Sequence, residues 1–142
     1  MPVRVSLATS ERFACVTLEG AVTWSDIANA MRGLYGRPDA DPSIRVLWDG
    51  RAIRSMVMHP EDLREMKALR VELAAGLDGG RTAVVVRREL DTMMAHLFSR
   101  QVRDTRREHR VFRDLDAALT FLGLDAIVEA FDRVLLEEQA RP

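Results

Sequence analysis

The chain has 142 residues, 47% of them hydrophobic, which is sufficient for one domain with a continuous core. Its 21 basic and 22 acidic side chains leave a formal net charge of -1, which disfavours generic binding to nucleic acid or to an anionic membrane. A single cysteine, Cys15, excludes an internal disulfide. Because residues 1–10 lack the apolar core of a signal peptide and no uncharged apolar stretch approaches about 18 residues, we expect a cytoplasmic protein.

The first residues predict a β-hairpin. Residues 3–7 alternate apolar and polar side chains, and residues 13–18 form a second run rich in β-forming residues. Ser10-Glu11-Arg12 between the two runs is polar and suits a turn. We therefore expect two neighbouring antiparallel strands at the start of the chain.

A helix and a buried strand follow the hairpin. Thr23 or Ser25 can cap the helix, whose apolar residues recur at spacings of three and four until Gly36 ends it. Ile44 to Trp48 then forms an apolar-rich run that closes at Asp49-Gly50. Such a run predicts a strand that is buried on both faces, at the centre of the sheet.

The next segments alternate helices and strands. Residues 51–59 lack a clear period and predict a loop, after which Pro60 opens a helix that ends at Gly76. Thr82 to Val86 is another β-branched run, and the apolar residues from Leu90 to Val102 follow a helical period. This alternation is typical of a parallel sheet with helical crossovers.

The last third predicts a short strand and two helices. Arg110 to Arg113 forms the strand, and Asp114 can cap a helix that Gly123 ends. Residues 124–138 predict a further amphipathic helix. Its apolar stripe must be buried, so we expect it to cap the sheet or to form a homodimer.

The order of these elements predicts a single α/β domain over residues 1–142. Its sheet should be mostly parallel and five-stranded, starting with an antiparallel hairpin, with helices packed on it. Residues 124–142 should form a C-terminal helical extension of this domain.

No recognisable catalytic or cofactor motif follows any predicted strand. The sequence contains neither a G-x-G-x-x-G loop nor a Walker A loop. His59, His96 and His109 lie far apart and lack a second ligand at helical spacing, while Ser55 and Ser99 lack the G-x-S-x-G setting of a hydrolase nucleophile. We therefore expect no enzyme activity, no cofactor and no metal.

Charged and polar side chains gather after two neighbouring predicted strands. The candidates for binding a ligand or a partner are Asp49, Arg51, Arg54, Ser55, Arg87 and Arg88. Open α/β sheets bind ligands at the carboxyl ends of their strands, and converging guanidiniums hold a carboxylate, a phosphate or an acidic loop. The alternative is that these arginines are solvated or are neutralised by Glu61, Asp62, Glu89 and Asp91.

Two further groupings each have a simpler explanation. A basic cluster precedes and includes the last predicted strand, with the members Arg100, Arg103, Arg106, Arg107, Arg110 and Arg113. It contains no aromatic residue before Phe112, so we expect a solvated connector rather than an RNA site. Met93 and Met94, with Met56 and Met58, could line an adaptable apolar groove, although core packing explains them as well.

Several stretches of the sequence carry a resemblance to a known family. They are Leu18-Glu19-Gly20, Thr23 to Leu34, Val46-Leu47-Trp48-Asp49, Ala83-Val84-Val85-Val86, and Val111-Phe112-Arg113-Asp114 with Ala117-Ala118. Over residues 3–123 the sequence resembles the bacterial SpoIIAA-like group of the STAS and Sec14-like superfamily. The resemblance implies a non-enzymatic module that binds a protein partner, as in anti-sigma-factor antagonists, or an apolar ligand, as in Sec14-like relatives.

The resemblance does not extend to a phosphorylation switch. The antagonists carry a phosphorylatable serine in an Asp-Ser-Ser-Gly-like turn directly after the central strand, whereas Ser55 is offset and has different flanks. We expect a binding or regulatory module that engages a protein partner or a small acidic ligand at residues 49–58 with Arg87 and Arg88. The alternative is a carrier of an apolar, lipid-like molecule held between the sheet and the helices.

Overall fold

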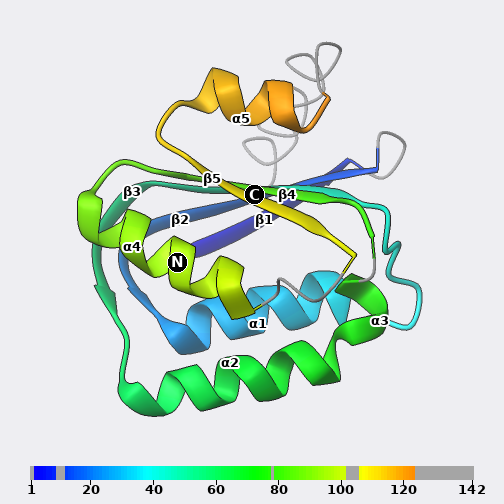
Figure 1. Cartoon of the computed structure of the whole chain (residues 1–142), viewed down its shortest axis with the longest axis horizontal. Helices are drawn as coiled ribbons and strands as arrows, with labels where there is room; N and C mark the ends of the chain where they lie inside the picture. Colours follow the sequence, from blue (N-terminus) through cyan, green and yellow to red (C-terminus); the bar gives the residue numbers. More distant parts are fainter. Residues whose placement is uncertain (1, 9–11, 78, 102–105, 124–142) are drawn as a thin grey trace, which may run out of the picture.

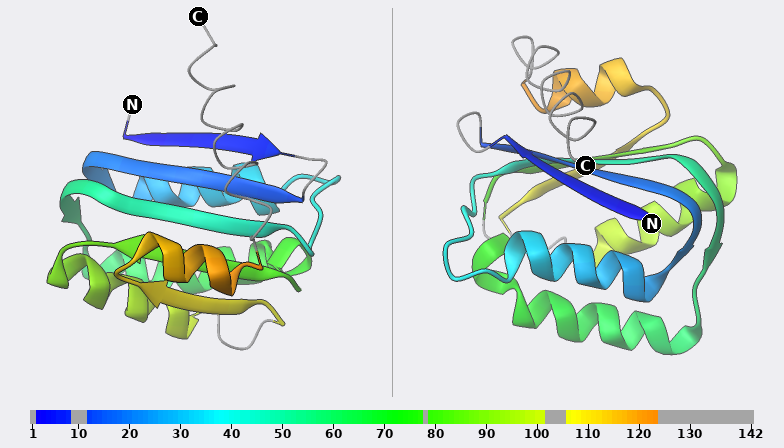
Figure 2. Two further views of the ribbon diagram at one scale, coloured as in Figure 1. Left: turned by 90° about the horizontal axis from the view of Figure 1, so that it is seen from above. Right: turned by 180° about the vertical axis from the view of Figure 1, so that it is seen from behind.

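The computed structural model describes residues 2–8, 12–77, 79–101 and 106–123. Their strands are β1 (Val3–Ala8), β2 (Phe13–Thr23), β3 (Arg45–Val57), β4 (Arg81–Val86) and β5 (Glu108–Phe112). The strands form one sheet in the order β1-β2-β3-β4-β5, in which β1 and β2 are antiparallel and the other neighbours are parallel (Figure 2). The predicted fold class is confirmed, with β3 at the centre of the sheet, whereas the predicted turn at residues 10–12 lies largely outside the described residues.

Helices cover both faces of this sheet (Figure 1). The helices are α1 (Trp24–Tyr35), α2 (Pro60–Glu72), α3 (Ala74–Leu77), α4 (Glu89–Gln101) and α5 (Leu115–Phe121). Helices α1 to α4 lie on one face and α5 lies on the other. Helix α2 packs against α1 and α4 and therefore forms an outer layer on its side of the molecule.

Strand β3 runs much further than the sequence pattern predicts. The prediction that it closes at Asp49-Gly50 is wrong, and so is the prediction that residues 51–59 form a loop, because β3 continues to Val57. Strand β2 likewise continues to Thr23. Both strands bend away from the rest of the sheet toward α1 and α2 (Figures 1 and 2).

The missing period in this part of β3 has a structural cause. Its extension pairs with that of β2, and the pairing contains register shifts between Thr17 and Glu19 and between Gly20 and Ala21. Each shift interrupts the alternation of side chains between the two faces of the sheet. A strand that carries such irregularities shows no clean period of two in its sequence.

Local capping signals fix the starts of the helices. Thr23, rather than Ser25, caps α1, since its side chain accepts a hydrogen bond from the backbone N–H of Asp26. Asp114 caps α5 in the same way, and Pro60 opens α2 as predicted. The remaining predicted boundaries of β4, α4 and β5 differ from the observed ones by one or two residues.

The end of α2 differs from the prediction. Helix α2 stops at Glu72, and Gly76 belongs to the separate short helix α3. A Cβ atom at Gly76 would lie 2.0 Å from the backbone oxygen of Tyr35. The glycine therefore permits α3 to lie directly against the end of α1 rather than simply ending the preceding helix.

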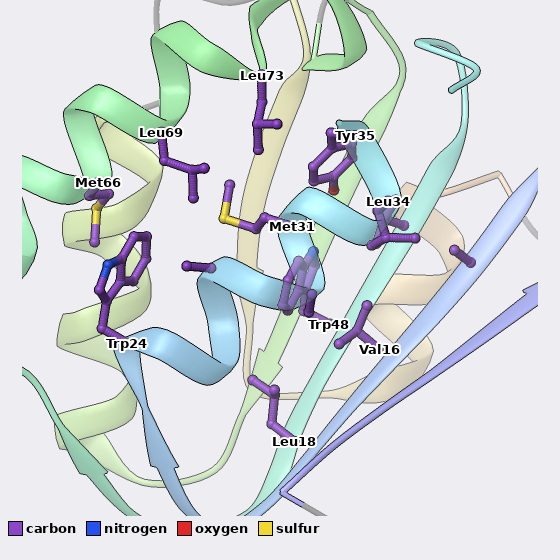
Figure 3. Packing of buried hydrophobic residues seen from close by; sticks show 14 of the residues in the cluster. Val16, Leu18, Trp24, Met31, Leu34, Tyr35, Trp48, Met66, Leu69 and Leu73 are labelled. Carbon is purple, nitrogen blue, oxygen red and sulfur yellow. The ribbon is translucent and has the colours of Figure 1, made fainter. Parts of the chain in front are cut away.

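Two clusters of buried side chains form the core, one on each face of the sheet. The larger cluster joins β2 and β3 to α1 and α2 and includes Trp24, Met31, Trp48 and Met66 (Figure 3). The smaller cluster packs residues of α5 such as Leu119 against the opposite face of β2, β3 and β4. The central strands are thus covered on both sides, in agreement with their unbroken apolar sequences.

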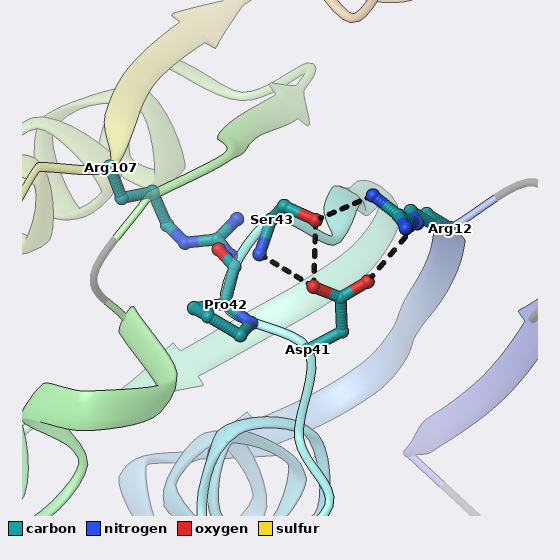
Figure 4. A network of polar contacts seen from close by, with 5 residues as sticks. All are labelled: Arg12, Asp41, Pro42, Ser43 and Arg107. Atoms are coloured by element: carbon teal, nitrogen blue, oxygen red, sulfur yellow. Dashed lines mark hydrogen bonds and ion pairs between the residues drawn. The ribbon is translucent and has the colours of Figure 1, made fainter.

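Arg107 joins several elements at the end of the sheet where the parallel strands begin. Its side chain is 4% exposed and donates hydrogen bonds to the carbonyl oxygens of Ile44, Arg81 and Pro42 at 2.8–3.1 Å. Figure 4 shows it beside the loop in which Ser43 donates hydrogen bonds to Asp41. For this residue the prediction of a solvated connector is wrong, because tertiary structure supplies carbonyl acceptors that are far away in the sequence.

Two remaining expectations concern the ends of the chain and the membrane. Within the described ranges, no helix is both long and apolar enough to cross a membrane. The predicted helix at residues 124–138, and with it the predicted extension over residues 124–142, lies outside the described residues.

Candidate functional site

A pocket lies between the sheet, its bent extension, and helices α1, α2 and α4. It is lined by Leu18, Trp24, Ile27, Trp48, Gly50, Ile53, Met56, Met58, Met66, Val84, Val86, Asp91, Met94 and Ala95. Its empty space is about 590 Å³, a volume that includes the solvent at its open mouth. Pockets that bind small molecules are lined mostly by apolar side chains with a few polar groups, so this pocket has the walls of a binding site.

The extension of β3 builds one wall of the pocket. Trp48 and Gly50 line it from the flat part of the strand, and Ile53 and Met56 line it from the bent part. At Gly50 an added Cβ atom would lie 2.9 Å from the side chain of Ile53. The absence of a side chain at Gly50 therefore leaves room for the side chain of Ile53, which also lines the pocket.

Helices supply the other walls. Trp24, the first residue of α1, is held by a hydrogen bond of 2.9 Å from its indole nitrogen to Glu65 of α2, and Met66 of α2 lies near its ring (Figure 3). Met94 and Ala95 contribute the surface of α4. Thioether side chains adapt their shape to a bound molecule at little cost, so the methionine-rich walls suit an apolar ligand.

The sequence partly anticipated these walls. Met56, Met58 and Met94 line the pocket, as the predicted apolar groove requires, whereas Met93 is 60% exposed and points away from the core. The other wall residues come from strands and helices far apart in the chain. Their sequences indicate burial, but no local signal shows that they surround an open space rather than fill a core.

Asp91 is the one charged residue among the residues that line the pocket. It lies in the first turn of α4, and its side chain is 1% exposed. Its carboxylate lies 3.1 Å from Nε of Arg88, but neither of its oxygens accepts a hydrogen bond from any group that the structure describes. Burial raises the pKa of the Asp91 carboxyl, and the charge of Arg88 opposes this rise in the pKa.

The predicted rim does not form a single charged surface. Asp49 and Arg51 bind each other through two hydrogen bonds of 2.9 Å, and this interaction raises the pKa of Arg51. Because side chains alternate along a strand and both Trp48 and Gly50 face the pocket, Asp49 points to the opposite face of the sheet. The guanidinium of Arg51 is therefore already matched by a carboxylate, away from the pocket.

The other four predicted residues lie in β3 and in the segment between β4 and α4. Arg54 and Ser55 are exposed in β3 itself rather than in a turn after it. Arg87 is exposed directly after β4, and Arg88 forms the ion pair with Asp91. The suggestion that Asp91 neutralises a neighbouring arginine is thus confirmed, while Arg54 and Arg87 keep exposed side chains.

The sequence named Asp91 only as a residue that could neutralise a nearby arginine, not as part of a pocket. Its sequence signal, an acidic residue in the first turn of a helix, is the ordinary signal for a favourable interaction with the helix dipole. Only the packing of α4 against the sheet reveals that this buried acidic residue lines an apolar pocket.

Comparison with known proteins bears on the fold alone. No protein-family model matches the chain, and no curated protein matches it significantly. An uncharacterized protein of the DUF3478 family from Shewanella loihica PV-4, described as having a SpoIIAA-like fold, is similar in structure over 84% of this chain and 91% of its own, with a TM-score of 0.53 and 16% identity. The chain therefore has a SpoIIAA-like fold, as the resemblance of its sequence predicts.

Proposed function

We propose that this protein binds a small, largely apolar molecule in the pocket between the sheet and helices α1, α2 and α4, without acting on it chemically. The observation that carries the proposal is the pocket itself, whose walls are formed by two tryptophans, four methionines and aliphatic side chains. Removing apolar surface from water contributes about 25 cal/mol of favourable free energy for each Å² that is buried. A ligand that displaces water from these walls therefore gains affinity without any specific polar contact.

A titration with the neutral, donor-free fluorophore prodan tests this proposal. Prodan should bind the wild-type protein saturably at one site, with a rise in fluorescence. Ala95→Phe, which places a ring in the pocket from α4, should weaken binding at least about ten-fold, or about 1.4 kcal/mol. Ala95→Leu is a milder second variant, and Met93→Phe adds the same ring at an exposed position of the same helix.

This titration has results that support the proposal and results that contradict it. Weaker binding by both Ala95 variants, with Met93→Phe equal to wild type, supports the pocket as the site. Absence of saturable binding, or equal binding by all four folded proteins, would contradict the proposal. Native mass spectrometry of freshly purified protein adds an independent measurement, in which a mass above that of the bare chain supports carriage of a ligand.

A second candidate function is the binding of a protein partner or a small acidic ligand at the charged rim. The observation in its favour is that Arg54 and Arg87 are exposed, although Arg51 and Arg88 already contact carboxylates. Replacing Arg51, Arg54, Arg87 and Arg88 by alanine should abolish capture of an acidic partner. Unchanged capture by this variant would exclude the rim as the binding surface.

A further inference from the structure

Three of the helices that the structure describes carry an aspartate at their third position, and two of these aspartates have an ordinary capping role. Asp26 of α1 accepts a hydrogen bond of 2.9 Å from the backbone N–H of Thr23. Asp62 of α2 accepts one of 2.6 Å from the backbone N–H of His59. In both helices the carboxylate satisfies a backbone donor that would otherwise lack a partner at the helix start.

Asp91 occupies the same position of α4 but does not cap that helix. Its oxygens accept no hydrogen bond from the described residues, although the side chain is almost completely buried. The nearby Nε of Arg88 lies within ion-pair distance but leaves the accepting capacity of the carboxylate open. A buried acceptor without a hydrogen bond is destabilising, and more so when it is charged, so capping does not explain this aspartate.

The position of Asp91 in the pocket suggests what it accepts. It is the charged residue of a wall that is otherwise formed by side chains such as Met94 on the same helix and Trp24 and Trp48 across the space. In binding pockets, a few polar groups among apolar walls fix the orientation of the ligand. A carboxylate accepts hydrogen bonds from O–H and N–H groups and repels another carboxylate.

We infer that Asp91 anchors the polar end of the ligand, and that the ligand is an apolar molecule whose polar end donates a hydrogen bond, as an alcohol or an amine does. This inference rests on the proposed function, since it names the ligand class of the same pocket. It excludes fatty-acid-like carboxylates as preferred ligands. The apolar walls provide affinity, and Asp91 provides selection among ligands of equal length.

Displacement of prodan by four compounds that each contain eight carbon atoms tests the inference. These compounds are 1-octanol, octylamine, octanoate and 1-methoxyheptane, the last an isomer of octanol that cannot donate a hydrogen bond. The measured quantity is the ratio of the half-displacing concentrations of methoxyheptane and octanol. Asp91→Leu, which keeps the approximate shape of the side chain, should lower this ratio about ten-fold while prodan still binds.

Two further variants separate the effect of a hydroxyl donor from that of an amine donor and control for the removal of a negative charge. Asp91→Asn keeps one accepting oxygen without the negative charge, so it should retain more of the preference for octanol than of the preference for octylamine. Glu89→Leu removes an exposed carboxylate from the same helical turn and should leave every ratio at its wild-type value.

Specific results would overturn the inference. An unchanged ratio in Asp91→Leu shows that Asp91 does not select the donor, and octanoate displacing prodan better than octanol shows that Arg88 rather than Asp91 receives the polar end. Failure of prodan to bind the wild type is a different result, because it overturns the proposed function and this inference with it. Normal prodan binding combined with an unchanged ratio overturns the inference alone.

Discussion

At the scale of single residues, the same amino acid at the same helical position has opposite effects in two parts of this molecule. Asp26 closes a capping box with Thr23 in which both partners are satisfied. Asp91 is buried beside Arg88 in the wall of an apolar pocket, with no hydrogen bond from the described residues. The energetic role of an acidic residue in a first helical turn therefore depends on what lies opposite it.

This contrast predicts opposite changes in stability for one substitution. Asp26→Leu should lower the free energy of unfolding by about 1 kcal/mol, since a backbone donor loses its acceptor. Asp91→Leu should raise it by about 1 kcal/mol. Removing a buried carboxylate that accepts no hydrogen bond from the described residues should outweigh two losses, the ion pair with the partly exposed Arg88 and about 0.3–1 kcal/mol of interaction with the helix dipole. Urea unfolding at pH 7 measures both changes, and destabilisation by Asp91→Leu would show that the carboxylate has a structural role.

At the scale of elements, helix ends were predictable where the deciding contact is local. Thr23 caps a helix three residues from its partner, and Asp114 does the same for α5. The ends of β2 and β3 were not predictable, because each extension depends on pairing with a strand about thirty residues away, across register shifts. The position of α3 likewise depends on the close approach of Gly76 to the distant residue Tyr35.

Two glycines in helices illustrate this difference and predict opposite results for Gly→Ala. Gly33 is exposed within α1, and an added Cβ would meet nothing within 4 Å, so Gly33→Ala should raise the free energy of unfolding by about 0.5–1 kcal/mol. At Gly76 the Cβ would collide with the backbone of Tyr35, so Gly76→Ala should lower it by about 1–3 kcal/mol. Thermal unfolding of the two variants beside wild type measures both effects; destabilisation at Gly33 would contradict the first.

At the scale of the whole molecule, buried polar groups join the loop before β3 to the starts of β4 and β5. Arg107 contacts three backbone segments through its hydrogen bonds and lies 5.2 Å from the ring of Tyr35. His109 of β5 lies in the same region, beside a small cavity that Arg107 also lines. Burial, together with the charge of Arg107, lowers the pKa of His109 to about 4.

The pKa of His109 predicts how stability depends on pH. Since the ordinary pKa of histidine is 6.5 and that of folded His109 is about 4, the unfolded chain binds a proton between these values while the folded chain does not. The contribution of this residue to stability is therefore complete above about pH 6.5 and is lost as the pH falls toward 4, by up to about 3 kcal/mol. Urea unfolding between pH 7 and 4 should show a shallower acid loss in His109→Gln than in wild type.

The control for this measurement is His96→Gln, at an exposed position of α4. This variant removes a histidine without touching the buried region around Arg107. If His109→Gln loses as much stability on acidification as wild type does, then burial of His109 does not contribute to the acid sensitivity of the fold.

The sequence by itself determined the order of the strands, the hairpin, the central position of β3 and the caps at Thr23 and Asp114, because apolar periodicity and capping depend on near neighbours in the chain. Tertiary structure alone decided that β3 continues to Val57, that Arg107 is buried, and that Asp49 and Asp91 face opposite sides of the sheet. Those outcomes depend on partners distant in sequence, which a local pattern does not encode. The same reason explains why the methionines indicated an apolar environment, whereas only the folded chain showed an open pocket with one carboxylate in its wall.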